Sequence, residues 1–260
     1  MTTAQEKLGK IHLVGIGPGD AQYLAPAASQ ALADSHVIVG FRSYIQQIEG
    51  LTAGKEVVSM ELGQELERAA AAVDSAYAGK TVAVVSSGDA GIYGMSGPVF
   101  RVLTDRNWDG HAPAVETVPG VSAMQAAAAV LGSPLMQDFC AISLSDLLTP
   151  WEKIRERLEA AGQGDFVVAL YNPRSQRRQG QLLEAREILL KHRAGDTPVG
   201  IVGDAFRPGQ RVKITSLQGL EKEAESVDMV TIVVIGNSTT YLHAGKVITP
   251  RGYEEKTKSS

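Results

Sequence analysis

The chain has 260 residues, of which 44% are hydrophobic and 21% are charged, and its formal net charge is −4 at pH 7. This length suits one large or two small domains, and the composition is that of a globular protein rather than a disordered one. The negative charge argues against a general nucleic-acid binder, and no apolar stretch reaches the roughly 18 residues of a membrane helix. The single cysteine, Cys140, excludes an intramolecular disulfide, so we expect a cytoplasmic protein.

The first half of the chain alternates short apolar runs with helical patterns, which is typical of α/β proteins. The expected strands are residues 11–16, 36–40, 81–86 and 114–118. The expected helices are residues 25–35, 62–77, 98–106 and 122–131. Because residues 81–86 form an unbroken apolar run, we expect this strand to be buried on both faces.

The second half repeats the alternation. The expected strands are residues 141–144, 166–171, 198–202, 211–216 and 229–235, and the expected helices are residues 151–161 and 180–192. The pattern therefore predicts two α/β domains, residues 1–118 and 139–250. Residues 119–138 are the expected hinge region, and the polar residues 251–260 are expected to form a frayed tail.

A glycine-rich loop, residues 15–20, follows the first expected strand. Its place between a strand and a helix suggests a dinucleotide-binding turn, but two details disfavour a nicotinamide cofactor. Asp20 stands where that motif requires a third glycine, and Pro18 lacks an amide that a pyrophosphate site uses. The glycines still permit a sharp turn at the carboxyl edge of a strand, where ligands bind in open α/β sheets.

A second glycine-rich loop, residues 86–94, follows the expected buried strand and carries one carboxylate, Asp89. The glycines allow a flat or extended ligand to approach the backbone closely. Asp89 suits an ammonium group or ribose hydroxyls as partners. The alternative is that Asp89 caps the helix that follows.

Arginines occur in loops after several expected strands, among them Arg42, Arg174 and Arg178. On an acidic chain, such loops suggest an anionic small molecule, because the guanidinium pairs well with carboxylates. The alternative for each arginine is a solvated charge. The five histidines lack metal-ligand spacing, so we expect no protein-bound metal, and Cys140 is expected to be a small buried side chain rather than a nucleophile.

Four motifs, taken in order, resemble those of the tetrapyrrole methylases, which are S-adenosyl-L-methionine (SAM)-dependent enzymes of siroheme and cobalamin synthesis. These motifs are residues 14–20, 87–89, 119–123 and 169–173. The resemblance extends from Ile11 to Gly252. It implies two α/β domains with the active site and SAM in the cleft between them, a fold distinct from Rossmann-type methyltransferases. It also implies a homodimer.

The resemblance carries over individual site residues as well. Those implied to contact SAM are Pro18, Ser87, Gly88, Asp89, Ile92, Ser122, Ala123, Asn172 and Ala205. The candidates for a catalytic acid or base are Asp89, Ser87, Tyr93 and Asp146. Arg42, Arg174 and Arg178 are the candidates for binding the carboxylates of a tetrapyrrole substrate. Methyl transfer to carbon depends mainly on alignment of the two reactants, and it leaves S-adenosyl-L-homocysteine as the second product.

Within the family, four segments resemble the branch that methylates precorrin-3B at C17 and contracts the macrocycle to precorrin-4 in cobalamin synthesis. They are residues 40–44, 87–95, 143–151 and 231–238. The alternatives are another precorrin or cobalt-precorrin methyltransferase, acting on cobalt-precorrin-3 at C17 or at another ring carbon, and a non-catalytic tetrapyrrole carrier. Intact glycine loops disfavour the carrier, while metal-free and cobalt-loaded substrates fit the residues equally.

Overall fold

The computed structural model describes residues 9–253, and the chain divides into two compact units, Met1–Ala123 (unit 1) and Met124–Ser260 (unit 2). The boundary falls within residues 119–138, the segment expected to be a hinge. That segment contains helix α5 (Ala123–Leu131) and the short strand β6 (Gly132–Ser133). Most of the expected frayed tail, residues 254–260, lies outside the described residues.

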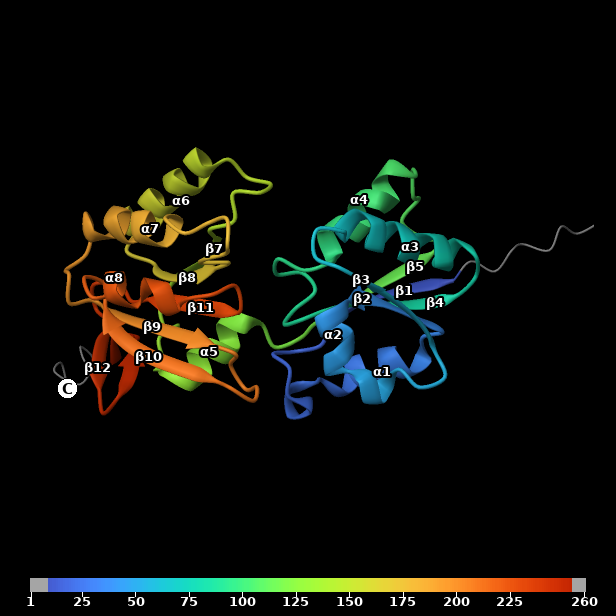
Figure 1. The fold of residues 1–260 in the computed structure, drawn as a ribbon, viewed down its shortest axis with the longest axis horizontal. Helices are drawn as coiled ribbons and strands as arrows, with labels where there is room; N and C mark the ends of the chain where they lie inside the picture. The colour runs from blue at the N-terminus through green and yellow to red at the C-terminus, as the bar shows by residue number, and fades with distance from the viewer. Residues whose placement is uncertain (1–8, 254–260) are drawn as a thin grey trace, which may run out of the picture. The chain divides into compact units, whose positions relative to one another are not determined.

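Unit 1 is built on a five-stranded, fully parallel sheet with the order β3-β2-β4-β1-β5 (Figure 1). Its strands are β1 (Lys10–Gly15), β2 (Val37–Phe41), β3 (Glu56–Met60), β4 (Thr81–Ser86) and β5 (Ala114–Val118). Residues 82–86 of β4 are buried, which confirms the strand expected to be covered on both faces. Strands β1 and β4 lie at the centre of the sheet, so their carboxyl ends are adjacent.

Helices cover both faces of this sheet. Helices α3 (Glu65–Tyr77) and α4 (Ser96–Asp105) pack on one face, where Leu13 and Val84 meet Val73. Helix α1 (Pro26–Asp34) packs on the other face, where Val14 and Val85 meet Leu32. The alternation of neighbouring residues between the two cores follows from the two-residue period of a strand. The short helix η1 (Ala21–Tyr23) lies between β1 and α1. The short helices α2 (Arg42–Gln47) and η2 (Glu49–Leu51) lie between β2 and β3.

Unit 2 is built on a mixed five-stranded sheet with the order β10-β9-β11-β8-β7. Its strands are β7 (Phe139–Ser143), β8 (Val167–Tyr171), β9 (Pro198–Gly203), β10 (Arg211–Ser216) and β11 (Thr231–Ile235). Strand β7 is parallel to β8, and β11 is antiparallel to both β8 and β9. Strands β7, β8 and β9 therefore run in one direction and end at the same edge.

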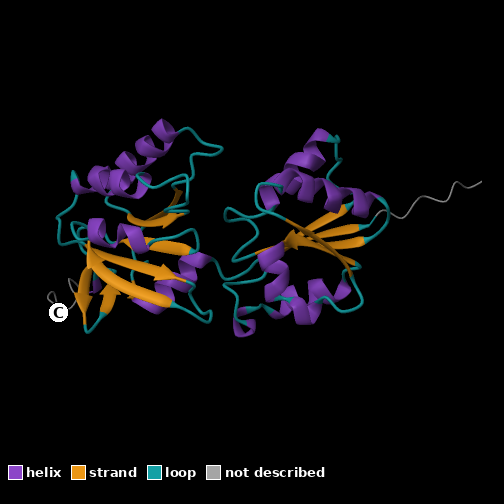
Figure 2. Cartoon of the chain, in the orientation of Figure 1, coloured by secondary structure: helices purple, strands orange, loops and turns teal. Residues whose placement is uncertain are grey.

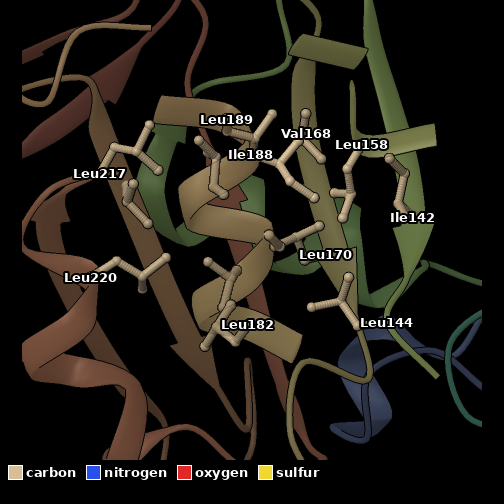
Figure 3. Packing of buried hydrophobic residues seen from close by; sticks show 14 of the residues in the cluster. Ile142, Leu144, Leu158, Val168, Leu170, Leu182, Ile188, Leu189, Leu217 and Leu220 are labelled. Atoms are coloured by element: carbon tan, nitrogen blue, oxygen red, sulfur yellow. The ribbon is translucent and has the colours of Figure 1, made fainter. Parts of the chain in front are cut away.

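One face of this sheet carries the main core of unit 2. Helices α6 (Trp151–Gln163), α7 (Gln181–Leu190), α8 (Leu220–Glu223) and η3 (Ala224–Ser226) cover this face. Figure 3 shows Ile188 and Leu189 of α7 beside Val168 and Leu170 of β8. On the other face, α5 lies against β9, where a side chain on Gly200 would collide with Leu131.

Several elements differ from the sequence-based expectation. Strand β3 was not expected; it forms the edge of its sheet and is largely exposed, so its sequence lacks a buried apolar run. Helices α2 and α8 and the hairpin β12 (Tyr241–His243) and β13 (Lys246–Ile248), which pairs with β6, were not expected either. Figure 2 shows the resulting alternation of helices and strands in each unit. Within residues 9–253, no helix combines the length and apolar character that crossing a membrane requires.

Candidate functional site

Three loops converge at the carboxyl edge of the unit 1 sheet, because β1 lies between β4 and β5. The loops after β1 and β4 are joined by a pair of backbone hydrogen bonds between Gly17 and Gly88. The amide of Gly17 donates to the carbonyl of Gly88 at 3.1 Å, and the amide of Gly88 donates to the carbonyl of Gly17 at 2.7 Å. Both glycines have positive φ, 75° and 70°, which favours glycine at these two positions.

The loop after β5 approaches the other two so closely that only glycine fits. A Cβ on Gly120 would lie 2.2 Å from the carbonyl oxygen of Gly88 and 2.7 Å from that of Gly15. A Cβ on Gly15 would lie 2.7 Å from the amide nitrogen of Gly120. Because the colliding atoms are backbone, a small side-chain rotation cannot relieve the contact. The motifs around residues 15, 88 and 120 therefore meet in space.

The carboxylate of Asp89 links two of these loops. Its Oδ1 accepts a hydrogen bond from the amide of Gly91 at 2.8 Å, and its Oδ2 accepts one from the amide of Gly120 at 3.0 Å. The expected alternative, that Asp89 caps the next helix, is wrong: the N-cap of α4 is Met95, six residues later. Asp89 is used instead to hold the loops after β4 and β5 together.

The other unit 1 candidates for cofactor binding lie around this convergence. A Cβ on Gly88 would lie 3.4 Å from the amide nitrogen of Ala123 and 3.6 Å from the Cα of Ser122, so these three residues are neighbours. Ser122 is buried. Two further candidates are sequence neighbours of the paired glycines: Pro18 follows Gly17, and Ser87 precedes Gly88.

Farther along the loop after β4, the structure presents two exposed side chains, Ile92 and Tyr93. Tyr93 has a φ of 53°, a left-handed conformation that is uncommon for an aromatic residue. Arg42 begins α2 at the carboxyl end of β2, and its Nη2 lies 2.5 Å from Oε1 of Glu61. Both side chains of this ion pair are more than half exposed, so solvent screens it.

At the carboxyl edge of the unit 2 sheet, the loops after β7 and β8 are joined through Asn172. Asn172 has a φ of 49°, and its Nδ2 donates to Oγ of Ser143 at 3.0 Å. The same hydroxyl accepts the amide of Ser145 at 3.2 Å, and the amide of Leu144 donates to the carbonyl of Tyr171 at 2.9 Å. Ser143 and Ser145 were not predicted as site residues, although both lie in residues 143–151, a segment that resembles the family.

Two of the three arginines of the loop after β8, Arg174 and Arg178, direct their guanidinium groups at protein atoms. Nη1 of Arg174 donates to the carbonyl of Ala224 at 2.8 Å. Nε of Arg178 donates to the carbonyl of Asn172 at 3.2 Å, and Nη1 donates to Oγ of Ser145 at 3.4 Å. Arg178 is buried, and burial lowers the pKa of its guanidinium, while the carboxylate of Asp146 opposes that shift.

The last two candidates lie at the same edge. Asp146, which is exposed, accepts a hydrogen bond from Nε2 of Gln181 at 3.1 Å and lies 3.8 Å from Nη1 of Arg178. Ala205 follows β9 and sits between two left-handed residues, Asp204 with φ of 50° and Phe206 with φ of 58°. Strand β11 separates β9 from β8, so Ala205 and Asn172 follow strands that are not neighbours.

The acid–base candidates are thus divided between the units: Ser87, Asp89 and Tyr93 belong to one loop of unit 1, and Asp146 belongs to unit 2. Burial raises the pKa of the Cys140 thiol, which keeps it protonated at neutral pH and disfavours it as a nucleophile. In the part of the chain that the structure describes, no group of three or more His, Cys, Asp or Glu side chains is arranged to hold a metal ion.

Comparison with known proteins gives these loops a family context. A family model described as Tetrapyrrole (Corrin/Porphyrin) Methylases matches residues 10–221. The chain belongs to this family. The match includes every unit 1 and unit 2 site candidate described above, so the resemblance carried by the four glycine- and asparagine-containing motifs is confirmed.

Three curated relatives of this methylase show how far the similarity extends. A cobalt-factor III methyltransferase of Priestia megaterium is 47% identical over 249 residues, which are 95% of this chain but 46% of that protein. A probable cobalt-factor III C(17)-methyltransferase of Salmonella typhimurium is 44% identical over 94% of this chain and 99% of that protein. A precorrin-3B C(17)-methyltransferase of Sinorhizobium sp is 38% identical over 94% of this chain and 97% of that protein. The methylase thus spans about half of the first relative and nearly all of the other two.

Solved structures confirm the predicted fold class. The crystal structure of the methyltransferase CobJ matches with a TM-score of 0.87 and 36% identity, covering 93% of this chain and 100% of that chain. A uroporphyrin-III C-methyl transferase from Thermus thermophilus, solved in complex with S-adenyl homocysteine, shares the fold with a TM-score of 0.69. It is 23% identical and covers 88% of this chain and 97% of that chain. The methylase therefore has the α/β fold of this family rather than that of the Rossmann-type methyltransferases.

Proposed function

We propose that the protein is a SAM-dependent methyltransferase of cobalamin synthesis that methylates C17 of a tetrapyrrole and contracts its macrocycle. The observation that carries this proposal is the 44% identity to the probable cobalt-factor III C(17)-methyltransferase of Salmonella typhimurium over nearly the full length of both chains. The sequence-based expectation named precorrin-3B as the substrate. Because the two cobalt-factor III relatives are 47% and 44% identical and the precorrin-3B relative is 38% identical, we favour the cobalt-loaded substrate.

The metal-free substrate precorrin-3B is the second candidate. It is supported by the 38% identity to the Sinorhizobium protein, which this chain covers almost entirely. Both candidates need the same cofactor and the same ring carbon, so they differ only in what the substrate site accepts. The homodimer and the cytoplasmic location implied by the family resemblance are part of the same proposal.

The residues of the converging unit 1 loops fit SAM as the methyl donor. Glycine at positions 17, 88 and 120 lets these loops pack directly on one another, because a Cβ at each position would lie 2.7, 3.4 and 2.2 Å from protein backbone atoms. When bound, SAM supplies a methyl group on a positively charged sulfur. The proposed cofactor residues of these loops are the polar Ser87 and Ser122 and the apolar Pro18, Ile92 and Ala123. In unit 2, Asn172 and Ala205 are the proposed cofactor residues.

The main task of these residues is to orient two large reactants, since alignment alone lowers the barrier to methyl transfer considerably. Asp89 holds the loops after β4 and β5 together, because its carboxylate accepts hydrogen bonds from the amides of Gly91 and Gly120. Ring contraction also requires proton movement, for which Ser87, Asp89, Tyr93 and Asp146 are the proposed groups.

Among the three proposed carboxylate-binding arginines, Arg42 has the most accessible guanidinium. Its side chain is 65% exposed, and its partner Glu61 is itself exposed, so a substrate carboxylate can replace that partner at little cost. Arg174 donates to the carbonyl of Ala224 and is half-buried. We therefore propose Arg42 as the principal contact for the substrate's acidic side chains in unit 1.

The test is an anaerobic incubation of the purified protein with methyl-labelled SAM and either cobalt-factor III or precorrin-3B. The products are analysed by mass and by carbon NMR. We expect a labelled methyl group at C17 of a contracted ring, formed faster from cobalt-factor III. A label at another ring carbon would overturn the C17 assignment, and faster turnover of precorrin-3B would overturn the cobalt preference. Tight binding of S-adenosylhomocysteine without transfer to either substrate would support a carrier.

A further inference from the structure

Arg178 is a charged side chain in an unusual setting, the interior of a loop. It lies in the connection between β8 and α7, and only 7% of its surface is exposed. Its backbone closes a tight turn with Ser175: the amide of Ser175 donates to the carbonyl of Arg178 at 2.9 Å, and the amide of Arg178 donates to the carbonyl of Ser175 at 3.2 Å. The turn sends the guanidinium back toward the start of its own loop.

There the guanidinium connects two loops. Nε donates to the carbonyl of Asn172 at 3.2 Å, and Nη1 donates to Oγ of Ser145 in the loop after β7 at 3.4 Å. Nη1 also lies 3.8 Å from Oδ1 of Asp146 in that loop. A guanidinium is suited to this role because its donors are fixed in one plane and can serve several acceptors at once.

The residue held in this way, Asn172, has a left-handed backbone. Its φ of 49° lies in a region that non-glycine residues seldom adopt and that Asn adopts more readily than most. Arg178 holds the carbonyl of Asn172, and Ser143 accepts the side-chain amide. The backbone carbonyl of Asn172 is therefore held by Arg178 from its own loop, and its side chain is held by Ser143 at the end of β7.

This geometry argues against a direct role for Arg178 in binding substrate carboxylates. A guanidinium that is almost entirely buried, with protein acceptors on Nε and Nη1, offers little surface to an anion in solvent. Its neighbour Arg177, in the same loop, is exposed and keeps its charge in solvent. Burial also lowers the pKa of Arg178, in keeping with a group screened from water.

We propose that Arg178 is a positioning residue: it fixes Asn172 and the loop after β7 in the conformation in which Asn172 meets the methyl donor. This inference rests on the proposed function, since it takes SAM as the ligand of Asn172. Arg178 is then required for cofactor affinity, whereas the substrate's acidic groups are bound elsewhere.

The test compares R178Q with R177Q, which removes the same charge from the same loop at an exposed site. Affinity for S-adenosylhomocysteine is measured by calorimetry, and the KM of the tetrapyrrole is measured at saturating SAM. We expect R178Q to weaken S-adenosylhomocysteine binding about tenfold or more, with the tetrapyrrole KM changed less than about twofold. R177Q should bind S-adenosylhomocysteine like the wild type. R178K keeps the charge but replaces the planar guanidinium by a single ammonium group, so its affinity for S-adenosylhomocysteine should lie between those of R178Q and the wild type.

A large rise in the tetrapyrrole KM of R178Q with unchanged S-adenosylhomocysteine affinity would overturn the inference and assign Arg178 to the substrate. If R178Q does not fold, S145A removes one of the bonds from Arg178 without leaving a charge unpaired. S145A should weaken S-adenosylhomocysteine binding by a smaller factor, and wild-type affinity in S145A would overturn the inference. Failure of the proposed function is separate: the wild type itself would then fail to bind S-adenosylhomocysteine or to methylate either tetrapyrrole.

Discussion

The carboxylate of Asp89 is bonded to the backbone of a residue 31 positions later, since its Oδ2 accepts the amide of Gly120 at 3.0 Å. Its Oδ1 accepts the amide of Gly91 at 2.8 Å. One side chain therefore joins the loop after β4 to the loop after β5, at the point where the family motifs meet. Both oxygens of Asp89, a predicted catalytic acid or base, are therefore occupied by backbone amides.

Replacement of Asp89 by Asn tests which role dominates. In D89N, one oxygen becomes an NH₂ group that faces a backbone amide, so one of the two hydrogen bonds is lost. We expect the free energy of unfolding in urea to fall by about 1–3 kcal/mol and the affinity for S-adenosylhomocysteine to fall with it. If stability and affinity stayed at wild-type values while methyl transfer stopped, Asp89 would act in proton transfer instead.

Replacement of Gly120 by Ala tests the close approach of the three loops. The new Cβ would lie 2.2 Å from the carbonyl oxygen of Gly88, so the backbone has to move. We expect G120A to lower the free energy of unfolding by about 1–3 kcal/mol and to weaken S-adenosylhomocysteine binding. G97A is the matched control, because Gly97 lies in the first turn of α4 with nothing within 4 Å of its Cβ position. Equal free energies of unfolding and equal S-adenosylhomocysteine affinities in G120A and G97A would contradict the close approach of Gly120 to Gly88.

Replacement of Arg42 by Gln tests the proposed contact with substrate carboxylates. Arg42 is exposed, so R42Q should fold with unchanged stability but raise the KM of the tetrapyrrole several-fold, about 1 kcal/mol of lost binding for an exposed ion pair. R101Q is the control, since Arg101 is similarly exposed and paired with Asp105 on α4. The measurement is steady-state kinetics at several salt concentrations. An R42Q KM equal to that of R101Q would remove Arg42 from the substrate site.

His12 gives stability a dependence on pH. Burial lowers the pKa of His12, and Lys10 lowers it further, while Glu116 and Asp34 act in the opposite direction. The unfolded chain therefore binds a proton at His12 at a higher pH than the folded chain does. We expect the free energy of unfolding to fall as the pH drops below about 6.5, and to fall less steeply in H12N. Urea denaturation between about pH 8 and pH 5 checks this, and identical slopes for the two proteins would contradict it.

Most strands were predictable from sequence, whether buried, like β4, or largely exposed, like β5 and β10. Residues 81–86, 114–118 and 211–216 were expected as strands with the bounds that the structure has. Strand β3 (Glu56–Met60), which also lies at the edge of its sheet and is largely exposed, was not expected. Short connecting helices such as α2 (Arg42–Gln47) likewise lack a buried apolar period.

The candidate site was predictable in its parts. The glycine loop after β1 was expected at the carboxyl edge of a sheet and the one after β4 directly behind a buried strand, and both lie where they were expected. Sequence could not tell that Asp89 bonds to Gly120 rather than capping a helix, since that pairing depends on β1 lying between β4 and β5.

By itself, the sequence determined the α/β class, the main strands and the family, because apolar periodicity and glycine motifs are local properties of the chain. Only the tertiary structure separated Arg42, Arg174 and Arg178, which the sequence presented as equal candidates. One is exposed beside Glu61, one is bonded to a carbonyl, and one is buried between two loops. The partner of a polar group is set by strand order and loop packing, which bring together residues that are far apart in the chain.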